Sequence, residues 1–419
     1  MPSCRACPAS NNPSCVSLSD LLYEVPKLWD FTPSRYWNVL LSVNKEVRRQ
    51  VQHTVTCIKI TEALQPGQLH HLTEGGWSQL RCLDLSKSYM KAATAAQLSN
   101  GAWPLLQSLT LARGRNFSDL STCSADVFRQ FKGKWPLLKS LTVSMHRMDM
   151  AQVIALTEID WSLLQTLCIE PLDDAISALI KGNWPELKDL SVGNEMTGGL
   201  EYLAVIPWST LQRLRVNFAQ VTPSGMYSLI QAHLPQLQEL CFVNTIWYTE
   251  GKDLAILGQA QWPLLSKLEL IGVSASLEGI RHLVTGQWPM LHTVAFDFSD
   301  ITDKHIPLFV QAHWPNVQNL TLVGYFEHME VLDICMRKWL ALQTLKLGMG
   351  TEQTINVWMS NLARWIFSSF QHRFVAVVKQ HCLLSAAGVH KNATITSSRQ
   401  HLFHNLVAGF SATDLSCQV

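Results

Sequence analysis

Charged residues are scarce in this chain of 419 residues. Asp, Glu, Lys and Arg make up 16% of it, against about 25% in ordinary globular proteins. The 33 basic and 32 acidic side chains nearly cancel, so the formal net charge is +1. Such a chain builds no extended field of one sign, and we therefore expect neither a nucleic-acid partner nor a membrane partner.

Long apolar runs are also missing, although 47% of the residues are hydrophobic. No run reaches the roughly 18 residues of a membrane-spanning helix, and the first residues lack the apolar core of a secretion signal. The 11 cysteines are an odd number without regular spacing. We expect Cys82, Cys168 and Cys241 to act as small apolar groups within regular elements. These features predict a reduced, intracellular protein, either cytoplasmic or nuclear.

Sequence patterns typical of catalytic sites are absent as well. The glycine pairs at 75–76 and 198–199 stand alone and do not form a phosphate-binding loop. We find neither a nucleophile elbow nor a zinc-protease helix. Cys4 and Cys7 have the spacing of one zinc-ligand pair, but no second pair follows. We therefore predict a protein that is not an enzyme and that needs no cofactor and no metal.

What the chain does have is one phrase that recurs between about residues 50 and 350, most clearly at residues 101–111, GAWPLLQSLTL. Each copy contains a tryptophan, which we call its anchor, and successive anchors lie 23 to 32 residues apart. A period of this length is typical of solenoids. The anchors are Trp77, Trp103, Trp135, Trp161, Trp184, Trp208, Trp262, Trp288, Trp314 and Trp339, with Leu234 at the equivalent place between Trp208 and Trp262.

Apolar residues follow each anchor at three, six and eight positions, as in Leu106, Leu109 and Leu111. The last two are two apart, which places them on one face of a short strand. The same spacing without a tryptophan adds an atypical first copy and makes twelve in all: Val55, Ile58 and Ile60.

The residues before each anchor predict the end of an amphipathic helix. Apolar residues recur five and often four positions before the anchor, as in Leu179 and Ile180. Two positions before it, glycine is frequent, and there we expect the left-handed geometry that ends many helices. Proline often follows the tryptophan and cannot continue a helix. Each copy is therefore predicted to be a helix, a stop, a short strand and a return loop.

One copy cannot bury its own apolar residues, so the copies must stack. We predict an α/β solenoid with a curved parallel sheet inside and helices outside. The tryptophan column then forms a stacked aromatic spine in the interior. The alternative is an exposed aromatic strip that binds sugar or peptide, and we favour the spine because every ring precedes the same apolar residues.

This spacing resembles the leucine-rich-repeat family, and its helical ribonuclease-inhibitor-like subclass best. The resemblance covers about 300 residues and implies that the concave face binds a protein partner. The family usually has Asn or Cys three positions after the last strand leucine, where it bonds to the loop backbone. Here that position holds residues such as Ser88, Leu172 and Val273. The backbone groups must therefore be satisfied in some other way.

Residues 1–16 are rich in Ser, Asn, Pro and Cys and are expected to be disordered. Residues 17–50 predict three short helices. Their closing part is similar to the second half of an F-box, in which Leu40, Val43 and Val47 would contact a Skp1-type adaptor. This resemblance implies a substrate-recruiting subunit of a ubiquitin ligase. The alternative is a helical cap that shields the first copy.

The repeat is predicted to stop near residue 350. Residues 351–371 fit a C-terminal helical cap, with Trp358, Leu362 and Trp365 on one helix face. Residues 372–419 begin with an apolar run at 374–378 and form a tail whose order the sequence leaves open. A catalytic role for this tail is an alternative from a different class.

Candidate binding residues lie at the exposed strand positions, on either side of the second strand leucine and just beyond the third. Their signs alternate, and Arg213 with Arg215 is the nearest approach to an anion-binding pair. An insertion at 112–122 adds a loop of the kind that often makes contacts, although a tolerated insertion explains it too. A solvated face is the alternative for the whole candidate set: Asp84, Arg113, Asp189, Arg213, Arg215, Glu239, Lys267, Glu269 and Asp297.

The F-box resemblance leads to a direct test. We expect the full chain to capture a Skp1-type adaptor in a pull-down, and we expect the double change Leu40→Ala/Val43→Ala to abolish capture, because it removes apolar contacts from one helix face. If the unaltered chain captures no adaptor, residues 17–50 are a cap only.

Overall fold

The computed structural model describes residues 52–60, 72–73, 76–86, 96–112, 125–172, 174–193, 199–206, 208–217, 220–243, 246–247, 252–273, 275–325, 339, 341–349 and 375–380. They fall into two compact units. The first comprises Met1–Met145 with Glu158–Leu164, and the second comprises His146–Thr157 with Gln165–Val419. The expected disordered start, the F-box-like segment, the C-terminal cap and residues 381–419 lie outside the described residues.

In the described residues the first unit has four parallel strands, and a helix precedes the last of them. The strands are β1 (Cys57–Lys59), β2 (Cys82–Leu85), β3 (Ser108–Ala112) and the first part of β4 (Ser140–Met148), and the helix is α6 (Ala125–Arg129). Each strand pairs with the next in the register that the repeat predicts, so that Leu83 lies beside Leu109 and Leu111 beside Val143. These four side chains are completely buried.

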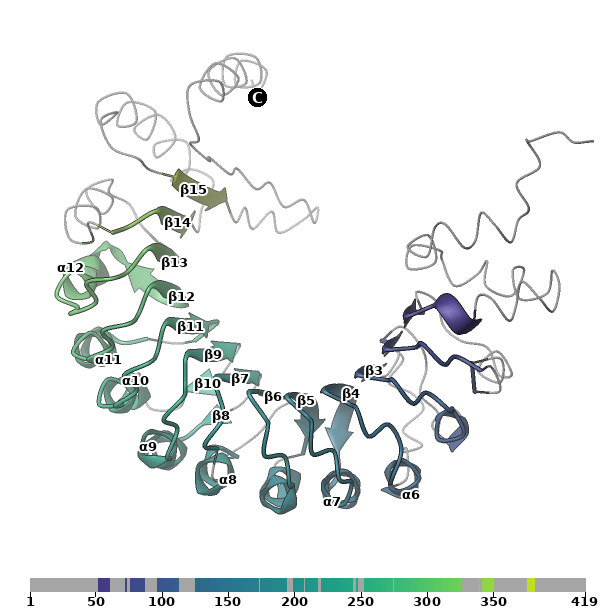
Figure 1. Ribbon diagram of the computed structural model, residues 1–419. Coiled ribbons are helices and arrows are strands. Elements are labelled where there is room, and N and C mark those ends of the chain that lie inside the picture. Colours follow the sequence, from purple (N-terminus) through teal and green to yellow (C-terminus); the bar gives the residue numbers. More distant parts are fainter. Residues whose placement is uncertain are drawn as a thin grey trace, which may run out of the picture. The chain divides into compact units, whose positions relative to one another are not determined.

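The second unit continues the same pattern, with strands on the inner side of an arc and helices on the outer side (Figure 1). Its parallel strands pair in the order β5, β6, β7, β9, β11, β12, β13, β14, β15. A separate two-stranded sheet joins the return loops of two neighbouring copies through β8 (Gln220–Val221) and β10 (Ile246–Trp247). The main strands are β5 (Thr166–Pro171), β6 (Asp189–Gly193), β7 (Arg213–Asn217), β9 (Glu239–Val243), β11 (Lys267–Ile271), β12 (Thr293–Thr302), β13 (Asn319–Tyr325), β14 (Thr344–Met349) and β15 (Val375–Gln380).

The helices of the second unit are short and follow the strands in sequence. They are α7 (Met150–Thr157), η3 (Asp174–Lys181), α8 (Leu200–Val205), α9 (Pro223–Gln231), α10 (Lys252–Leu257), α11 (Leu277–Leu283), η4 (Asp303–His305) and α12 (Ile306–Phe309). This alternation of parallel strands and outer helices through the described residues is the architecture of a leucine-rich-repeat solenoid, which confirms the predicted fold class.

Every one of the twelve predicted copies contributes a strand at its expected place, but the sheet does not end with the twelfth. Strand β15 pairs with β14 in parallel over six residues, with Thr344 beside Val375. Its valines favour an extended backbone. The sequence predicts an end of the repeat near residue 350, and the anchor position six residues before Ala376 holds Phe370 in place of a tryptophan. The sheet therefore extends one strand further than the repeat predicts.

Each anchor opens a tight turn that leads into the strand. The N–H of the leucine three residues on donates to the anchor carbonyl, at 3.1 Å from Leu106 to Trp103 and 3.0 Å from Leu265 to Trp262. The intervening proline is the second residue of this four-residue turn, where its fixed φ is favourable. Proline therefore shapes the turn in addition to ending the helix.

The glycines two positions before the anchor differ from the expectation. Among those that the structure describes, only Gly133 has a positive φ, of 73°. At Gly101, Gly182 and Gly286 a Cβ atom would instead lie 2.5 to 2.6 Å from the ring of the following anchor. The left-handed explanation is wrong at these three positions, where glycine is needed to make room for the indole.

The helix ends are capped by local side chains. Thr222 Oγ1 accepts from the N–H of Gly225 at 3.0 Å, and Ser276 Oγ accepts from that of Gly279 at 3.1 Å. The shortest copy, 23 residues long, has the 3₁₀ helix η3, which spans more length per residue than an α-helix. The apolar residue four before the anchor is not always buried, since Ile180 on η3 is 44% exposed.

The tryptophan column is internal, as predicted. Every anchor ring is at most 8% exposed, which rules out the alternative of an exposed aromatic strip. Neighbouring rings stack within each unit, with centroids 5.8 Å apart for Trp103 and Trp135 and 5.9 Å apart for Trp288 and Trp314. Such pairs contribute about 0.5 to 1.5 kcal/mol beyond the burial of their surface.

Indole N–H groups make some of the hydrogen bonds to backbone carbonyls that asparagine makes in related repeats. Trp314 Nε1 donates to the carbonyl of Gly286 at 3.1 Å, and Trp288 Nε1 to that of Ala260 at 3.2 Å. Trp161 Nε1 reaches the carbonyl of Lys134 at 3.3 Å. Each of these bonds joins an anchor to the corner of the preceding copy.

Backbone groups make a second link between copies. The carbonyl four residues after an anchor accepts two N–H groups from the next copy, as Gln238 does from Ser266 and Lys267 at 2.8 and 3.0 Å. Arg81, Gln107, Gln212 and His292 accept in the same way. These backbone hydrogen bonds therefore link the corners of neighbouring copies, although the asparagine ladder is missing.

The indole bonds predict an asymmetry between two tryptophan variants. Trp314→Phe removes a buried bond to Gly286, whereas Trp184→Phe removes an N–H that is buried without a partner. We expect Trp314→Phe to lower the free energy of unfolding by about 1 to 3 kcal/mol more than Trp184→Phe does. The reason is that only Trp314→Phe takes a hydrogen-bond donor away from a buried carbonyl, that of Gly286. Urea unfolding of the full chain measures this, and equal losses would contradict it.

Candidate partner-binding face

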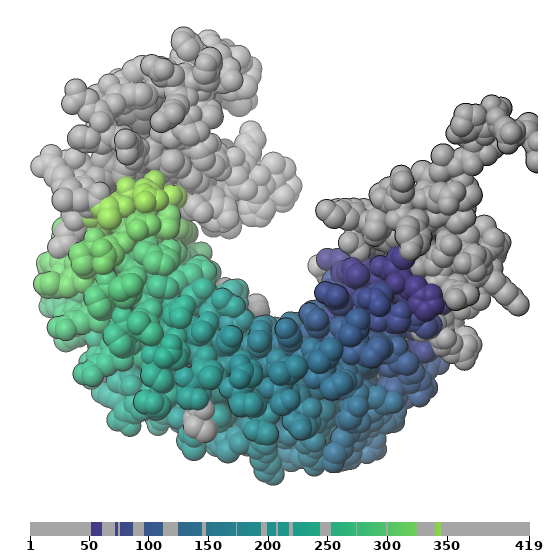
Figure 2. Space-filling view, viewed as in Figure 1, coloured from purple at the N-terminus to yellow at the C-terminus, as the bar shows by residue number. Residues whose placement is uncertain are grey.

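The candidate face is the inner side of the sheet in the second unit, formed by the strand positions that alternate with the buried ones. In Figure 2 this unit, coloured teal to green, is hollowed on the side where Figure 1 places its strands. Four predicted residues occupy equivalent places on β6, β7, β9 and β11. They lie in register as Asp189, Arg213, Glu239 and Lys267, so charges of opposite sign alternate from strand to strand.

These charges pair with one another. Arg213 forms an ion pair with Asp189, which also accepts from Thr166 Oγ1 at 3.0 Å. Lys267 Nζ lies 3.0 Å from Glu269 and 3.9 Å from Glu239. The hydrogen bond to Asp189 raises the pKa of Arg213 above its ordinary value. Five of the nine predicted residues thus form two neighbouring ion-paired groups, which the register of Arg213 with Glu239 places side by side. Together they are called here the charged lattice: Asp189, Arg213, Glu239, Lys267 and Glu269.

Arg215 lies next to the charged lattice, but its hydrogen bond goes to a residue outside it. Its Nε donates to Asn217 Oδ1 at 2.9 Å, and Asn217 Nδ2 donates in turn to Ser191 Oγ at 3.3 Å. Arg213 and Arg215, the nearest approach to an anion-binding pair in the sequence, are thus held by different partners, Asp189 and Asn217. Asn217 and Ser191 position Arg215, and the charge pattern alone did not reveal them.

The other predicted residues lie apart from the lattice. Asp84 belongs to the first unit, where its carboxylate lies 3.3 Å from Lys59 Nζ and accepts the N–H of Ser86. Burial opposes ionisation there, but the bonds from Ser86 and Lys59 outweigh it and lower the pKa of Asp84. Asp297 lies on β12 beside Ile271 and Val323. Arg113 and the adaptor-binding candidates Leu40, Val43 and Val47 lie outside the described residues.

Two of the cysteines that the sequence places within regular elements lie on this face, Cys168 on β5 and Cys241 on β9. Cys241 lies in register with Arg215 and Glu269, and its Sγ donates to Glu269 Oε2 at 3.2 Å. Burial, followed by the carboxylate of Glu269, raises the pKa of Cys241 to about 12. Burial likewise raises the pKa of Cys168. Both groups are therefore neutral thiols near pH 7 and poor nucleophiles.

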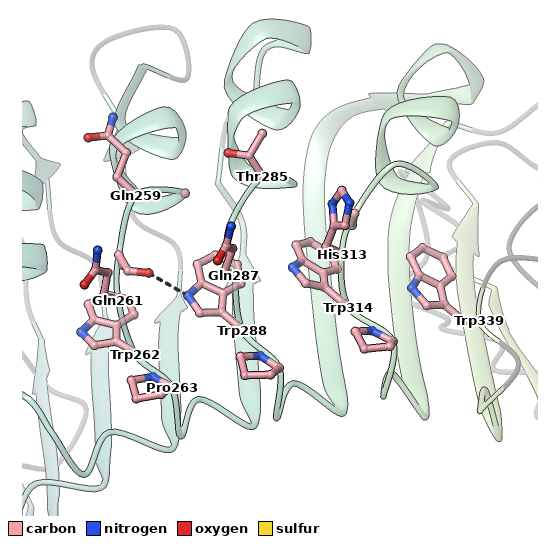
Figure 3. A pocket seen from close by; sticks show the side chains of 15 residues that line it. Gln259, Gln261, Trp262, Pro263, Thr285, Gln287, Trp288, His313, Trp314 and Trp339 are labelled. Atoms are coloured by element: carbon pink, nitrogen blue, oxygen red, sulfur yellow. Dashed lines mark hydrogen bonds between the residues drawn. The ribbon is translucent and has the colours of Figure 1, made fainter.

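A second hollow follows the corners of four consecutive copies rather than the strand face. It is an open groove of about 1250 Å³, lined by residues around the anchors Trp262, Trp288, Trp314 and Trp339 (Figure 3). The exposed side chains come from equivalent places, with Gln261, Gln287 and His313 just before successive anchors and proline just after. The recurrence of polar residues immediately before the tryptophan is the sequence signal for this groove.

This groove is nearly uncharged, and its rings present little surface. It can exchange hydrogen bonds through amides but lacks the ionic contacts of the strand face. Among the described residues there is no group of three or more His, Cys, Asp or Glu side chains arranged to hold a metal ion. None of the helices in the described part of the chain is long and apolar enough to cross a membrane.

The contact between Cys241 and Glu269 has a measurable consequence. Glu269→Gln removes the negative charge beside the thiol, so we expect the pKa of Cys241 to fall below about 12 yet to stay above its ordinary value of 9.0, because burial remains. Iodoacetamide labelling of the full chain at pH 8 to 10 should then be faster at Cys241. The control Glu278→Gln, on the outer helix α11, should leave the rate unchanged, and an unchanged rate in Glu269→Gln would refute the assignment.

The sequence matches no protein-family model and no curated protein. Among solved structures, the fold is similar to a chain from the crystal structure of the yeast Rad7–Elc1 complex, with 14% identity over 78% of this chain and 86% of that one and a TM-score of 0.49. It is also similar to an internalin from Listeria monocytogenes, with 17% identity over 73% of this chain and 70% of that one and a TM-score of 0.33. At this level of similarity the comparisons identify neither a partner nor an activity.

Proposed function

We propose that this chain is a non-enzymatic scaffold that binds a protein partner through the inner strand face of its second unit. The observation that carries the proposal is the charged lattice, which places paired charges of alternating sign on four neighbouring strands. Neighbouring strands are about 4.8 Å apart, so the lattice is a regular array on a rigid support.

Such a face suits a protein surface better than it suits a small ion or a nucleic acid. Its charges cancel locally, so it attracts no extended charge of one sign. Arg213 remains about half exposed although it is paired, and it can exchange its carboxylate for one on a partner. A partner fits if its acidic groups meet the basic side chains of the lattice and its basic groups meet the acidic ones. Surfaces that bring like charges together bind more weakly.

The two thiols on this face support binding rather than catalysis. A nucleophilic cysteine needs a lowered pKa, whereas those of Cys168 and Cys241 are raised. Cys241 instead contributes a thiol that donates to Glu269 and holds that carboxylate within the lattice.

An F-box-type role in a ubiquitin ligase is a second proposal. It rests on the resemblance of residues 39–51 and on the adaptor candidates Leu40, Val43 and Val47. In that case the strand face would select the substrate, and capture of a Skp1-type adaptor would distinguish the two proposals.

The scaffold proposal predicts which surface change releases a partner. The test compares affinity purification of the full chain from its native cells with purification of two variants that lose equal charge. Arg213→Ala/Arg215→Ala alters the inner face, and Arg281→Ala/Lys304→Ala alters exposed residues on α11 and η4. We expect the inner-face variant to bind a co-purifying partner roughly tenfold more weakly than the unaltered chain, which corresponds to about 1.4 kcal/mol. The outer variant should bind the same partner with unchanged affinity. Partners lost only from the outer variant would overturn the proposal.

A further inference from the structure

The inner face of the first unit carries two cysteines side by side at its first two strands. Cys57 on β1 and Cys82 on β2 lie in register. Their neighbours Ile58 and Leu83 are buried on the opposite face, so both thiols are on the inner face. Both are partly exposed, and neither belongs to a disulfide among the described residues. Paired strands are about 4.8 Å apart, within the 4.4 to 6.8 Å between Cα atoms that a disulfide spans.

The surroundings of Cys82 differ from those of the other described cysteines on strands. Hydrogen bonding by Cys57 is the largest influence, and together with Ser108 on β3 and the charge of Lys59 it outweighs burial and the opposing charge of Asp84, lowering the pKa of Cys82 to about 7. Ser108 lies in register with Cys82. Cys82 is thus flanked by a hydrogen-bonding partner on each side, and a large share of it is thiolate at neutral pH, the form that reacts.

We propose that Cys57 and Cys82 form a reversible thiol–disulfide pair on the inner face of the first unit. With hydrogen peroxide as the oxidant, the Cys82 thiolate attacks one peroxide oxygen and breaks the O–O bond, which gives a sulfenic acid and hydroxide; the hydroxide takes up a proton to become water. The Cys57 sulfur then attacks the sulfenic sulfur, the S–O bond breaks, and the thiol proton leaves with the oxygen as a second water. Two thiols are oxidised to one disulfide, and a dithiol reductant returns them by exchange.

The fold allows this bond and gives it a consequence. In the described part of the chain β1 is the first strand of the sheet and pairs only with β2, so it can shift without breaking a second ladder. The disulfide would join the first two copies covalently. It would also replace two thiols and their bonds to Ser108 and to each other, and so change the inner face. This inference does not depend on the lattice of the second unit.

The test is oxidation of the full chain followed by peptide mapping without reduction. With hydrogen peroxide at pH 7 we expect a peptide pair cross-linked between Cys57 and Cys82 that has lost two hydrogen atoms and that dithiothreitol separates. In the Cys57→Ser variant, where the hydroxyl preserves a hydrogen-bonding group, Cys82 should instead be trapped by dimedone as a sulfenic acid. Cross-links that join Cys82 to some other cysteine, or no cross-link at all, would overturn the proposal.

A second measurement needs no oxidant. At pH 7 we expect iodoacetamide to label Cys82 roughly fivefold or more faster than Cys168, because the thiolate fraction is far larger although each thiolate is somewhat less nucleophilic. Phenylarsine oxide, which bridges two adjacent thiols with loss of water, should protect Cys57 and Cys82 together. The Cys168→Ser variant should behave as the unaltered chain. Equal labelling of Cys82 and Cys168, or arsenical protection of one thiol alone, would contradict the pair.

Discussion

The structure depends on burial of the anchor tryptophan between consecutive copies. The ring lies at the corner where helix becomes strand, and no single copy encloses it. Full burial of one large apolar side chain contributes roughly 1.5 to 3 kcal/mol, and stacking of neighbouring rings adds to it. Because each ring is enclosed by its neighbours, the corners align, and alignment of the corners sets the register of the strands that follow.

The same constraint explains residues that otherwise look unrelated. Proline after the ring shapes the turn into the strand, and glycine two residues before it leaves room for the indole. The indole N–H then bonds to the carbonyl at the preceding corner in several copies. These bonds take over part of the role that an asparagine ladder has in related repeats, at the corner rather than in the return loop.

Because the register is fixed, side chains at equivalent positions of successive strands lie side by side on the inner face. The charge state and hydrogen bonds of each side chain therefore depend on its neighbours on the adjacent strands. Asp189, Arg213, Glu239 and Lys267 neutralise one another because they lie at one level on successive strands. Cysteines on the strand face of each unit differ partly for the same reason. Burial and then the carboxylate of Glu269 raise the pKa of Cys241 in the second unit, whereas hydrogen bonding by Cys57 and Ser108 lowers the pKa of Cys82 in the first.

The sequence by itself determined the repeat, its twelve strands and the interior place of the tryptophans, since each follows from spacing along the chain. Only the tertiary structure decided that Arg213 is paired with Asp189, that Cys57 lies beside Cys82, and that β15 extends the sheet. Those features join residues from different copies. Their contacts depend on register across strands and on side-chain geometry, and a linear pattern contains neither.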